Sequence, residues 1–153
     1  MKEGNVMRIG ELAKRTDCDV ETVRYYEKAG LLQEPSRNSA GYREYQDEHQ
    51  ERLQFIRHCR SLQIGLTDIR ALLEFKNNPA EGCQSVNELL DHHIERIAEQ
   101  MANLQTLQQQ LVTLRHQCDK PQPSQDCAIL QNLSEAASGH DCACHTESVD
   151  IRH

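Results

Sequence analysis

Residues 9–30, with the sequence IGELAKRTDCDVETVRYYEKAG, decide the fold. Three apolar residues near the start of this stretch share one face of a short helix. Asp19 stands where a second helix, residues 20–29, needs an N-cap, and Gly30 is the residue type that ends a helix. Two short helices joined by a tight turn predict a helix-turn-helix motif.

The second helix of this motif exposes polar side chains, because its apolar residues recur at the spacing of one buried face. Residues 35–45, PSRNSAGYREY, place turn formers between two short arms and predict a small hairpin wing. Arginine in a wing reaches phosphates or the minor groove, and tyrosine hydroxyls donate to phosphates. We therefore predict that double-stranded DNA is bound by Thr22, Arg24 and Tyr25 of the helix and by Arg37, Tyr42 and Arg43 of the wing.

The length and composition favour a small helical protein. The chain has 153 residues, of which 37% are hydrophobic and 4% aromatic, and its mean hydropathy is -0.75. These values suit one small domain joined to long amphipathic helices, so we expect an all-α dominated fold. After the wing, helices are expected over residues 47–62 and, capped by Thr67, over residues 68–76. No apolar run approaches the ~20 residues of a membrane span and no secretion signal is evident, which predicts a cytoplasmic protein with no membrane partner.

Charge divides the chain into two halves. Residues 1–76 hold 13 Lys/Arg and 13 Asp/Glu, so residues 77–153 carry the whole net charge of -7. The second half also contains six of the eight His and five of the seven Cys, a composition that suits cations. In a cytosolic chain these cysteines favour metal binding or redox sensing over disulfide bonds. Cys18 and Cys59, in the first half, are interpreted as small core residues.

An apolar seam runs along the second half. Its residues recur in alternating steps of four and three, which is the spacing of a coiled coil. The rest of the segment is polar, and no other segment is long enough to cover the seam, so we expect it to pair with its copy in a homodimer. The seam consists of Leu90, Ile94, Ile97, Met101 and Leu104.

Three cysteines of the second half are candidate metal ligands. Cys118 and Cys127 are separated by eight residues, two of them prolines, which form a loop able to close on one ion. A continuous helix between Cys83 and Cys118 would hold them ~50 Å apart. If the three cysteines serve one site, Cys83 must therefore come from the other chain of an antiparallel two-fold dimer. Sulfur ligands select soft or borderline divalent metals.

Several motifs resemble the MerR family of transcription activators. They are residues 7–13 (MRIGELA), 23–27 (VRYYE), 30–32 (GLL) and 41–45 (GYREY), together with Pro35, Arg37 and the runs at 51–53 and 55–57. With the patterns above, the resemblance implies four segments. These are a winged helix-turn-helix DNA-binding domain at 7–76, a long antiparallel coiled-coil dimerisation helix at 83–118, a metal-binding loop and short helix at 118–135, and a flexible tail with Cys and His at 136–153.

Within that family, Cys83, Cys118 and Cys127 resemble the ligands of divalent-metal sensors. The cadmium/lead-responsive branch is the most similar, because it shares residues 52–60 (RLQFIRHCR). The resemblance implies that Cd(II) or Pb(II), or alternatively Zn(II) or Hg(II), binds the three cysteines. It further implies that the dimer then distorts promoter DNA so that RNA polymerase can engage it, which activates metal-resistance genes.

The tail holds further ligand-type side chains, and two interpretations of it stay open. One is a second metal site formed by His140, Cys142, Cys144 and His145, with His93 of the long helix. The other is a tail of scavenging thiols that binds no specific metal.

Other function classes fit less well. A redox-sensing regulator of the same fold is the main alternative. An iron–sulfur protein would need four clustered cysteines, and a zinc hydrolase would need an open metal position beside a general base in a cleft. Neither arrangement is indicated, so we predict that the chain is not an enzyme.

Overall fold

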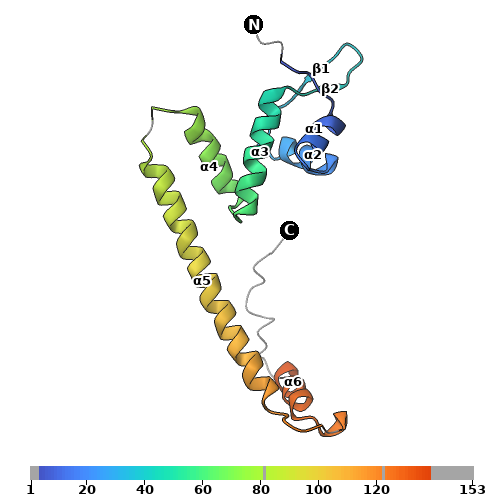
Figure 1. Ribbon diagram of the computed structural model, residues 1–153, viewed down its shortest axis with the longest axis vertical. Coiled ribbons are helices and arrows are strands. Elements are labelled where there is room, and N and C mark those ends of the chain that lie inside the picture. Colours follow the sequence, from blue (N-terminus) through green and yellow to red (C-terminus); the bar gives the residue numbers. More distant parts are fainter. Residues whose placement is uncertain (1–3, 81, 122, 139–153) are drawn as a thin grey trace. The chain divides into compact units, whose positions relative to one another are not determined.

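The computed structural model describes residues 4–138 except 81 and 122, and within these residues helices dominate, as the composition predicts (Figure 1). The described chain divides into two compact units, Met1–His93 and Ile94–His153. The first unit contains α1 (Ile9–Arg15), α2 (Val20–Lys28), β1 (Ser36–Arg37), β2 (Arg43–Glu44), α3 (Asp47–Ser61) and α4 (Leu66–Asn77). The helix α5 (Gln84–Arg115) begins in this unit and continues into the second.

The helices α1 and α2 form the predicted helix-turn-helix. Between them Asp17 adopts a left-handed conformation with φ of 52°, and the Thr16 hydroxyl donates to the Leu12 carbonyl at 2.7 Å. Asp19 occupies the N-cap position of α2, but its side chain makes no capping hydrogen bond, which corrects the predicted cap. Backbone bonds and the Thr16 hydroxyl therefore close the turn. Gly30 has φ of 73° and ends α2, as predicted.

The wing is also confirmed. β1 and β2 pair antiparallel, with Arg37 opposite Arg43. The Asn38 side-chain oxygen accepts the N–H groups of Ala40 and Tyr42, each at 3.0 Å, and this pair of bonds shapes the turn at the tip of the wing. At the base of the wing, Met7 and Tyr45 exchange two backbone hydrogen bonds of 2.8 Å, so the chain entering α1 is held beside the wing.

The second helix pair differs from the prediction in one detail. α4 begins at Leu66 with Gly65 as its N-cap, so Thr67 lies inside the first turn and is not the cap. The helix starts earlier because Ile64 is buried and Leu66 packs against the core, which places the chain for helix entry before Thr67. α3 begins at Asp47 as expected, where the Gln46 N–H donates to Nδ1 of the buried His49 at 3.0 Å.

The helices α1 to α4 and the segments that connect them share one hydrophobic core, to which β1 and β2 contribute no residue. Burial raises the pKa of both the Cys18 and the Cys59 thiols, and their packing in and against the core confirms their predicted structural role. The buried members of the core are Met7, Leu12, Ala13, Val23, Tyr26, Leu31, Leu32, Tyr45, Leu53, Ile56, Cys59, Ile64, Ile69 and Leu73.

Three arginines of α3 and α4 bind backbone carbonyl groups of the helix-turn-helix, one at the C-terminal end of α1 and two just after α2. Arg57 donates to the carbonyl of Thr16, Arg52 to that of Leu31, and Arg70 to that of Ala29. A guanidinium supplies several N–H groups to carbonyls that have no helical donor of their own. These three bonds therefore hold the helix-turn-helix against α3 and α4.

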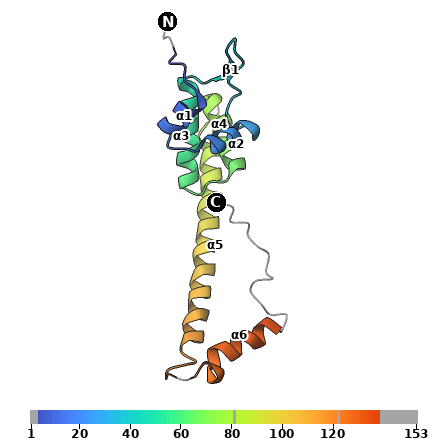
Figure 2. The same cartoon turned by 90° about the vertical axis from the view of Figure 1, so that its right-hand side faces the viewer.

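The second unit contains the rest of α5, then η1 (Ser124–Asp126) and α6 (Ala128–Ser138), and Figure 2 shows α5 as one unbroken helix. Most seam residues of α5 are exposed in the single chain; Leu90 is 39% exposed and Leu104 is 64% exposed. α5 and α6 have no buried residue among those described. In the described part of the chain, every helix is too short or too polar to cross a membrane.

Candidate nucleic-acid interface and thiol pair

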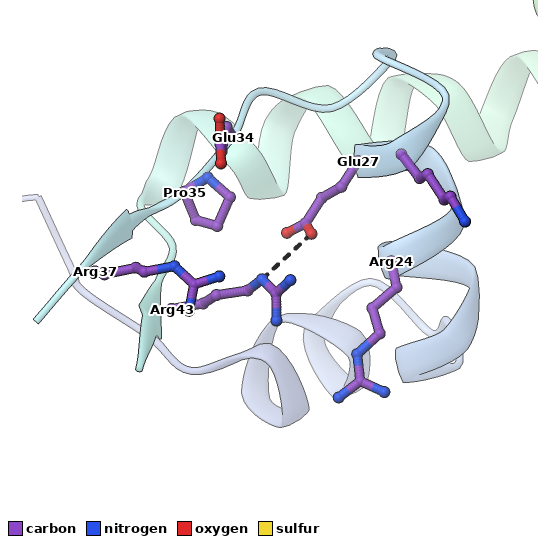
Figure 3. Close-up of a pocket in the computed structure, with 7 residues that line it drawn as sticks. Arg24, Glu27, Glu34, Pro35, Arg37 and Arg43 are labelled. Carbon is purple, nitrogen blue, oxygen red and sulfur yellow. Dashed lines mark ion pairs between the residues drawn. The ribbon is translucent and has the colours of Figure 1, made fainter. Parts of the chain in front are cut away.

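Three of the predicted DNA contacts lie together on the first unit. Arg24 of α2 and Arg37 and Arg43 of the wing line a cleft of about 450 Å³ (Figure 3). The same three arginines also line a second cleft of about 340 Å³. Glu27, Lys28, Glu34 and Pro35 complete the lining of the larger cleft. The fold thus brings side chains that are 13 and 19 residues apart in sequence to one surface, where an anionic ligand can meet all three guanidinium groups.

Each of these arginines is oriented by one acceptor. Arg24 pairs with Glu21 at 3.0 Å, and both side chains are at least half exposed. Arg37 donates to the Gly41 carbonyl at 3.0 Å. Arg43 Nε lies 3.5 Å from the Glu27 carboxylate, whose side chain is only 11% exposed. Because a guanidinium has N–H groups on three nitrogens, each arginine keeps donors for a phosphate or a base edge.

The other predicted contacts lie nearby on the same elements. Thr22 is half-buried on α2, whereas Tyr25 is 55% exposed and can reach a ligand. Tyr42, at the tip of the wing, is 58% exposed and lines the smaller cleft. Their roles in DNA binding stay predictions.

Arg8 is a further member of this surface that the sequence did not indicate. Its guanidinium lies 4.7 Å from the centre of the Tyr42 ring, and it lines the smaller cleft with Arg24, Arg37 and Arg43. The backbone bridge between Met7 and Tyr45 brings it there. Arg8 belongs to the motif at 7–13, but only this tertiary bridge reveals that it faces the wing.

Cys118 and Cys127 form a thiol pair at the two ends of the predicted loop, and both are partly exposed. A hydrogen bond from the Leu130 backbone N–H is the largest cause that lowers the pKa of Cys127; burial opposes it, and smaller contributions come from the Ile129 N–H and the Cys118 thiol. Cys127 immediately precedes α6, so its thiolate accepts the free N–H groups of the first turn. Cys127 is therefore the readily ionised thiol of the predicted loop, and its role as a metal ligand together with Cys118 stays a prediction.

The structure does not add Cys83 to this pair. Cys83 is exposed and precedes α5, where its carbonyl accepts the Asn87 N–H at 2.9 Å. Within the described residues of this one chain, no three Cys, His, Asp or Glu side chains gather closely enough to hold a metal ion.

The predicted second metal site falls mostly outside the described residues. His140, Cys142, Cys144 and His145 all lie there. His93 is described, and its Nε2–H donates to the Leu62 carbonyl at the end of α3, at 2.9 Å. This bond uses one ring nitrogen of His93 within the first unit.

Comparisons with known proteins agree with this architecture. The family described as MerR HTH family regulatory protein matches residues 7–76, and the one described as MerR, DNA binding matches residues 50–114. An HTH-type transcriptional regulator, a ZntR homologue of Haemophilus influenzae, is 43% identical over 109 residues, which are 71% of this chain and 81% of that protein.

Two solved structures extend the similarity to most of the chain. The transcription regulator PbrR691 of Ralstonia metallidurans CH34, in complex with lead(II), is 46% identical with a TM-score of 0.76 and covers 83% of this chain and 98% of its own. The regulator MerR of Bacillus megaterium MB1, in complex with mercury(II), is 28% identical with a TM-score of 0.64 and covers 84% and 99%. The chain therefore belongs to the MerR family of helix-turn-helix transcription regulators, and it is accordingly not an enzyme.

Proposed function

We propose that this chain is a metal-sensing transcription activator that binds promoter DNA as a homodimer and responds to a soft divalent ion. Cd(II) and Pb(II) are the favoured inducers, with Zn(II) and Hg(II) as alternatives. The ligands are Cys118 and Cys127 of one protomer and Cys83 of its partner. Binding of the ion changes the DNA-bound dimer so that it distorts the promoter and RNA polymerase can engage it. The activated genes are those of metal resistance.

The thiol pair Cys118 and Cys127 is the observation that carries this proposal. Two thiols at the ends of one short loop, one of them with a lowered pKa, form an electron-rich donor set that suits soft ions and is poor for Mg²⁺ or Ca²⁺. A bound ion would supply a link between the loop and a third ligand. The two solved relatives are complexes with lead(II) and mercury(II), which supports an ion of this class.

A partner chain is required by the length of α5. Cys83 precedes the helix and Cys118 follows it, and α5 is unbroken over 32 residues. At about 1.5 Å per residue such a helix holds its ends roughly 50 Å apart, so one ion cannot meet Cys83 and Cys118 of the same chain. The exposed apolar seam of α5 supplies the surface for antiparallel pairing, in which each chain contributes to two equivalent sites.

Metal titration of the purified dimer tests the proposal. We expect Cys83→Ser, Cys118→Ser and Cys127→Ser each to abolish metal-dependent transcription in a reconstituted assay while DNA binding is retained. Cys18→Ala is the matched control, because burial raises the pKa of that thiol and it packs against the core. Loss of metal response in the control alone would contradict the assignment of ligands.

Mixed dimers test the antiparallel arrangement. A Cys83→Ser chain paired with a Cys118→Ser chain should recover one complete site per dimer, because both substitutions then fall in the same site and the other site keeps all three cysteines. Recovery of no site would contradict ligation across the dimer.

A redox-sensing regulator of the same fold is the alternative that the thiol pair also allows, since two close thiols can form a disulfide bond. Oxidised and metal-loaded protein should be compared in the same transcription assay. Activation by oxidant in the absence of metal would favour the alternative.

The tail is tested separately. We propose that a chain ending at Ala137 keeps activation but loses a second, weaker site made of His140, Cys142, Cys144 and His145, with His93 as a further ligand. The metal bound per chain should then fall from about two to about one, because a tail ligand set must be ordered on binding. An unchanged stoichiometry would favour scavenging thiols.

A further inference from the structure

Glu27 is an acidic residue in the middle of a basic surface. It belongs to α2, and its side chain lies in the larger cleft between Arg24 and Arg43 (Figure 3). One carboxylate oxygen, Oε1, accepts a hydrogen bond from the hydroxyl of Tyr45. The other oxygen, Oε2, lies 3.5 Å from Nε of Arg43. The Glu27 carboxylate therefore joins α2 to Arg43 of β2 and to Tyr45 at the base of the wing.

The partners of Glu27 are held firmly. Tyr45 is fully buried, its ring packs edge-on against His49, and its backbone pairs with Met7. The Tyr45 hydroxyl therefore has little freedom, and it fixes the position of the Glu27 carboxylate. With that carboxylate 11% exposed, the ion pair to Arg43 is shielded from water more than the other arginine pairs of this surface.

Glu21 provides a comparison on the same helix. It also pairs with an arginine, Arg24, at 3.0 Å, but its side chain is 83% exposed and the pair lies within one helix. Such exposed pairs contribute little to structure. Glu27 instead connects two elements, so its loss would release the wing arginine relative to α2.

Charge alone predicts that removing the Glu27 carboxylate strengthens DNA binding, which differs from the effect expected of a residue that orients an arginine. A carboxylate near bound DNA repels phosphates, so removing it should strengthen binding to any duplex. A carboxylate that orients an arginine has a second effect, because a misplaced guanidinium no longer meets its phosphate or base. The two effects separate when binding to a preferred sequence is compared with binding to an unrelated one.

We propose that Glu27 is a positioning residue for DNA selectivity: its carboxylate, held by Tyr45, fixes Arg43 of the wing against α2. The Arg43 ion pair uses Nε, so the N–H groups of its terminal nitrogens remain for the DNA. This inference rests on the proposed function, since it assumes that the chain binds a preferred duplex.

The test compares Glu27→Gln with Glu21→Gln in the full-length dimer. Two probes are used: a duplex selected by the wild-type chain from a random-sequence pool, and a scrambled duplex of the same composition. Glu27→Gln should bind the selected duplex about tenfold more weakly, the size of one charge-assisted hydrogen bond, and the scrambled duplex more tightly. Glu21→Gln should bind both duplexes more tightly, so that their ratio is kept.

A double-mutant cycle shows whether Glu27 acts through Arg43. If it does, Glu27→Gln should no longer weaken binding to the selected duplex once Arg43→Ala is present. An unchanged penalty in the Arg43→Ala background overturns the proposal, and so does equal behaviour of Glu27→Gln and Glu21→Gln.

Tyr45→Phe serves as a second route, because it removes only the hydroxyl that holds Glu27. It should reduce selectivity in the same direction as Glu27→Gln, with thermal unfolding followed by circular dichroism to report stability. A loss of selectivity that simply follows the loss of stability in all variants overturns the proposal. If the wild-type chain selects no duplex from the pool, the proposed function fails instead, and the two failures are thereby distinguished.

Discussion

The two units of this protein differ in how many of their apolar residues are buried within a single chain. In the first unit, four helices and the wing bury fourteen apolar residues around one core. In the second, α5 and α6 have no buried residue among those described, and apolar residues such as Ile94 and Met101 are more than half exposed. A helix with an exposed seam gains little from its own chain. The comparison teaches that the first unit is stabilised within one chain, whereas the second unit presents an apolar face that the proposed dimer would cover.

The largest effect is expected from breaking the seam. Met101→Glu combined with Leu104→Glu places charges where the two copies of α5 meet, so the dimer should dissociate. Binding to the selected duplex should fall by about a hundredfold or more, because the two DNA-binding units are no longer linked. Sedimentation and DNA-binding measurements check this.

The matched control for the seam is Asn103→Glu with Gln105→Glu, which adds the same charge beside the seam. It should leave the protein dimeric. A charged seam that still forms dimers would show that the second unit does not depend on this face.

A core substitution sharpens the same comparison. Ile56 is fully buried, so Ile56→Ala should lower the free energy of unfolding by about 3 kcal/mol at any protein concentration. Ile94→Ala should instead have an effect that depends on concentration, because its contacts lie across the dimer. Urea unfolding at two protein concentrations distinguishes them. If the effects of Ile56→Ala and Ile94→Ala on unfolding depended equally on protein concentration, the division into a self-contained unit and a paired unit would be contradicted.

Arg8→Ala should have a smaller effect, confined to DNA binding. Its guanidinium stacks on Tyr42 in the arginine-lined cleft, so its loss should weaken binding about fivefold with little change in stability. Lys76→Ala is a matched control, because Lys76 lies 5.3 Å from the centre of the Phe55 ring on other elements. A fall in affinity as large in the control would remove Arg8 from the interface.

The smallest effect concerns pH and the core of the first unit. Burial lowers the pKa of His49, so the unfolded chain binds a proton more readily than the folded one. The free energy of unfolding should therefore have its full value at neutral pH. It should decline as the pH falls below the pKa of histidine in the unfolded chain, about 6.5. His49→Gln should reduce this decline, whereas His58→Gln, an exposed position on the same helix, should preserve it. Urea unfolding at pH 7.5 and 5.5 measures the difference.

Local patterns predicted much of the first unit. The apolar spacing of residues 9–30 and the turn formers at 35–45 are local signals, and the structure contains the corresponding helices and wing. The loop that ends in Cys118 and Cys127 was also predicted from sequence, and their role as metal ligands stays a prediction. Within the described residues of one chain, Cys83 belongs to no group of three ligand-type side chains, and its proposed companions belong to a second chain.

The features that sequence reasoning missed depend on tertiary contacts. Nothing in the sequence separates Glu21 from Glu27, yet one is exposed and the other lies under the wing. Arg8 reaches the wing only through the bridge between Met7 and Tyr45. The start of α4 at Leu66 reflects core packing, which took precedence over the capping preference of Thr67.

The anchoring of α2 has a consequence for how such a protein can diversify. Arg52, Arg57 and Arg70 donate hydrogen bonds to backbone carbonyl groups, which every amino acid possesses. The outward side chains of α2 can therefore be exchanged while the helix stays in its place. A duplicated gene could acquire a new target sequence by changing only that face, and a protein engineer could transplant the outward residues of another regulator onto the same scaffold.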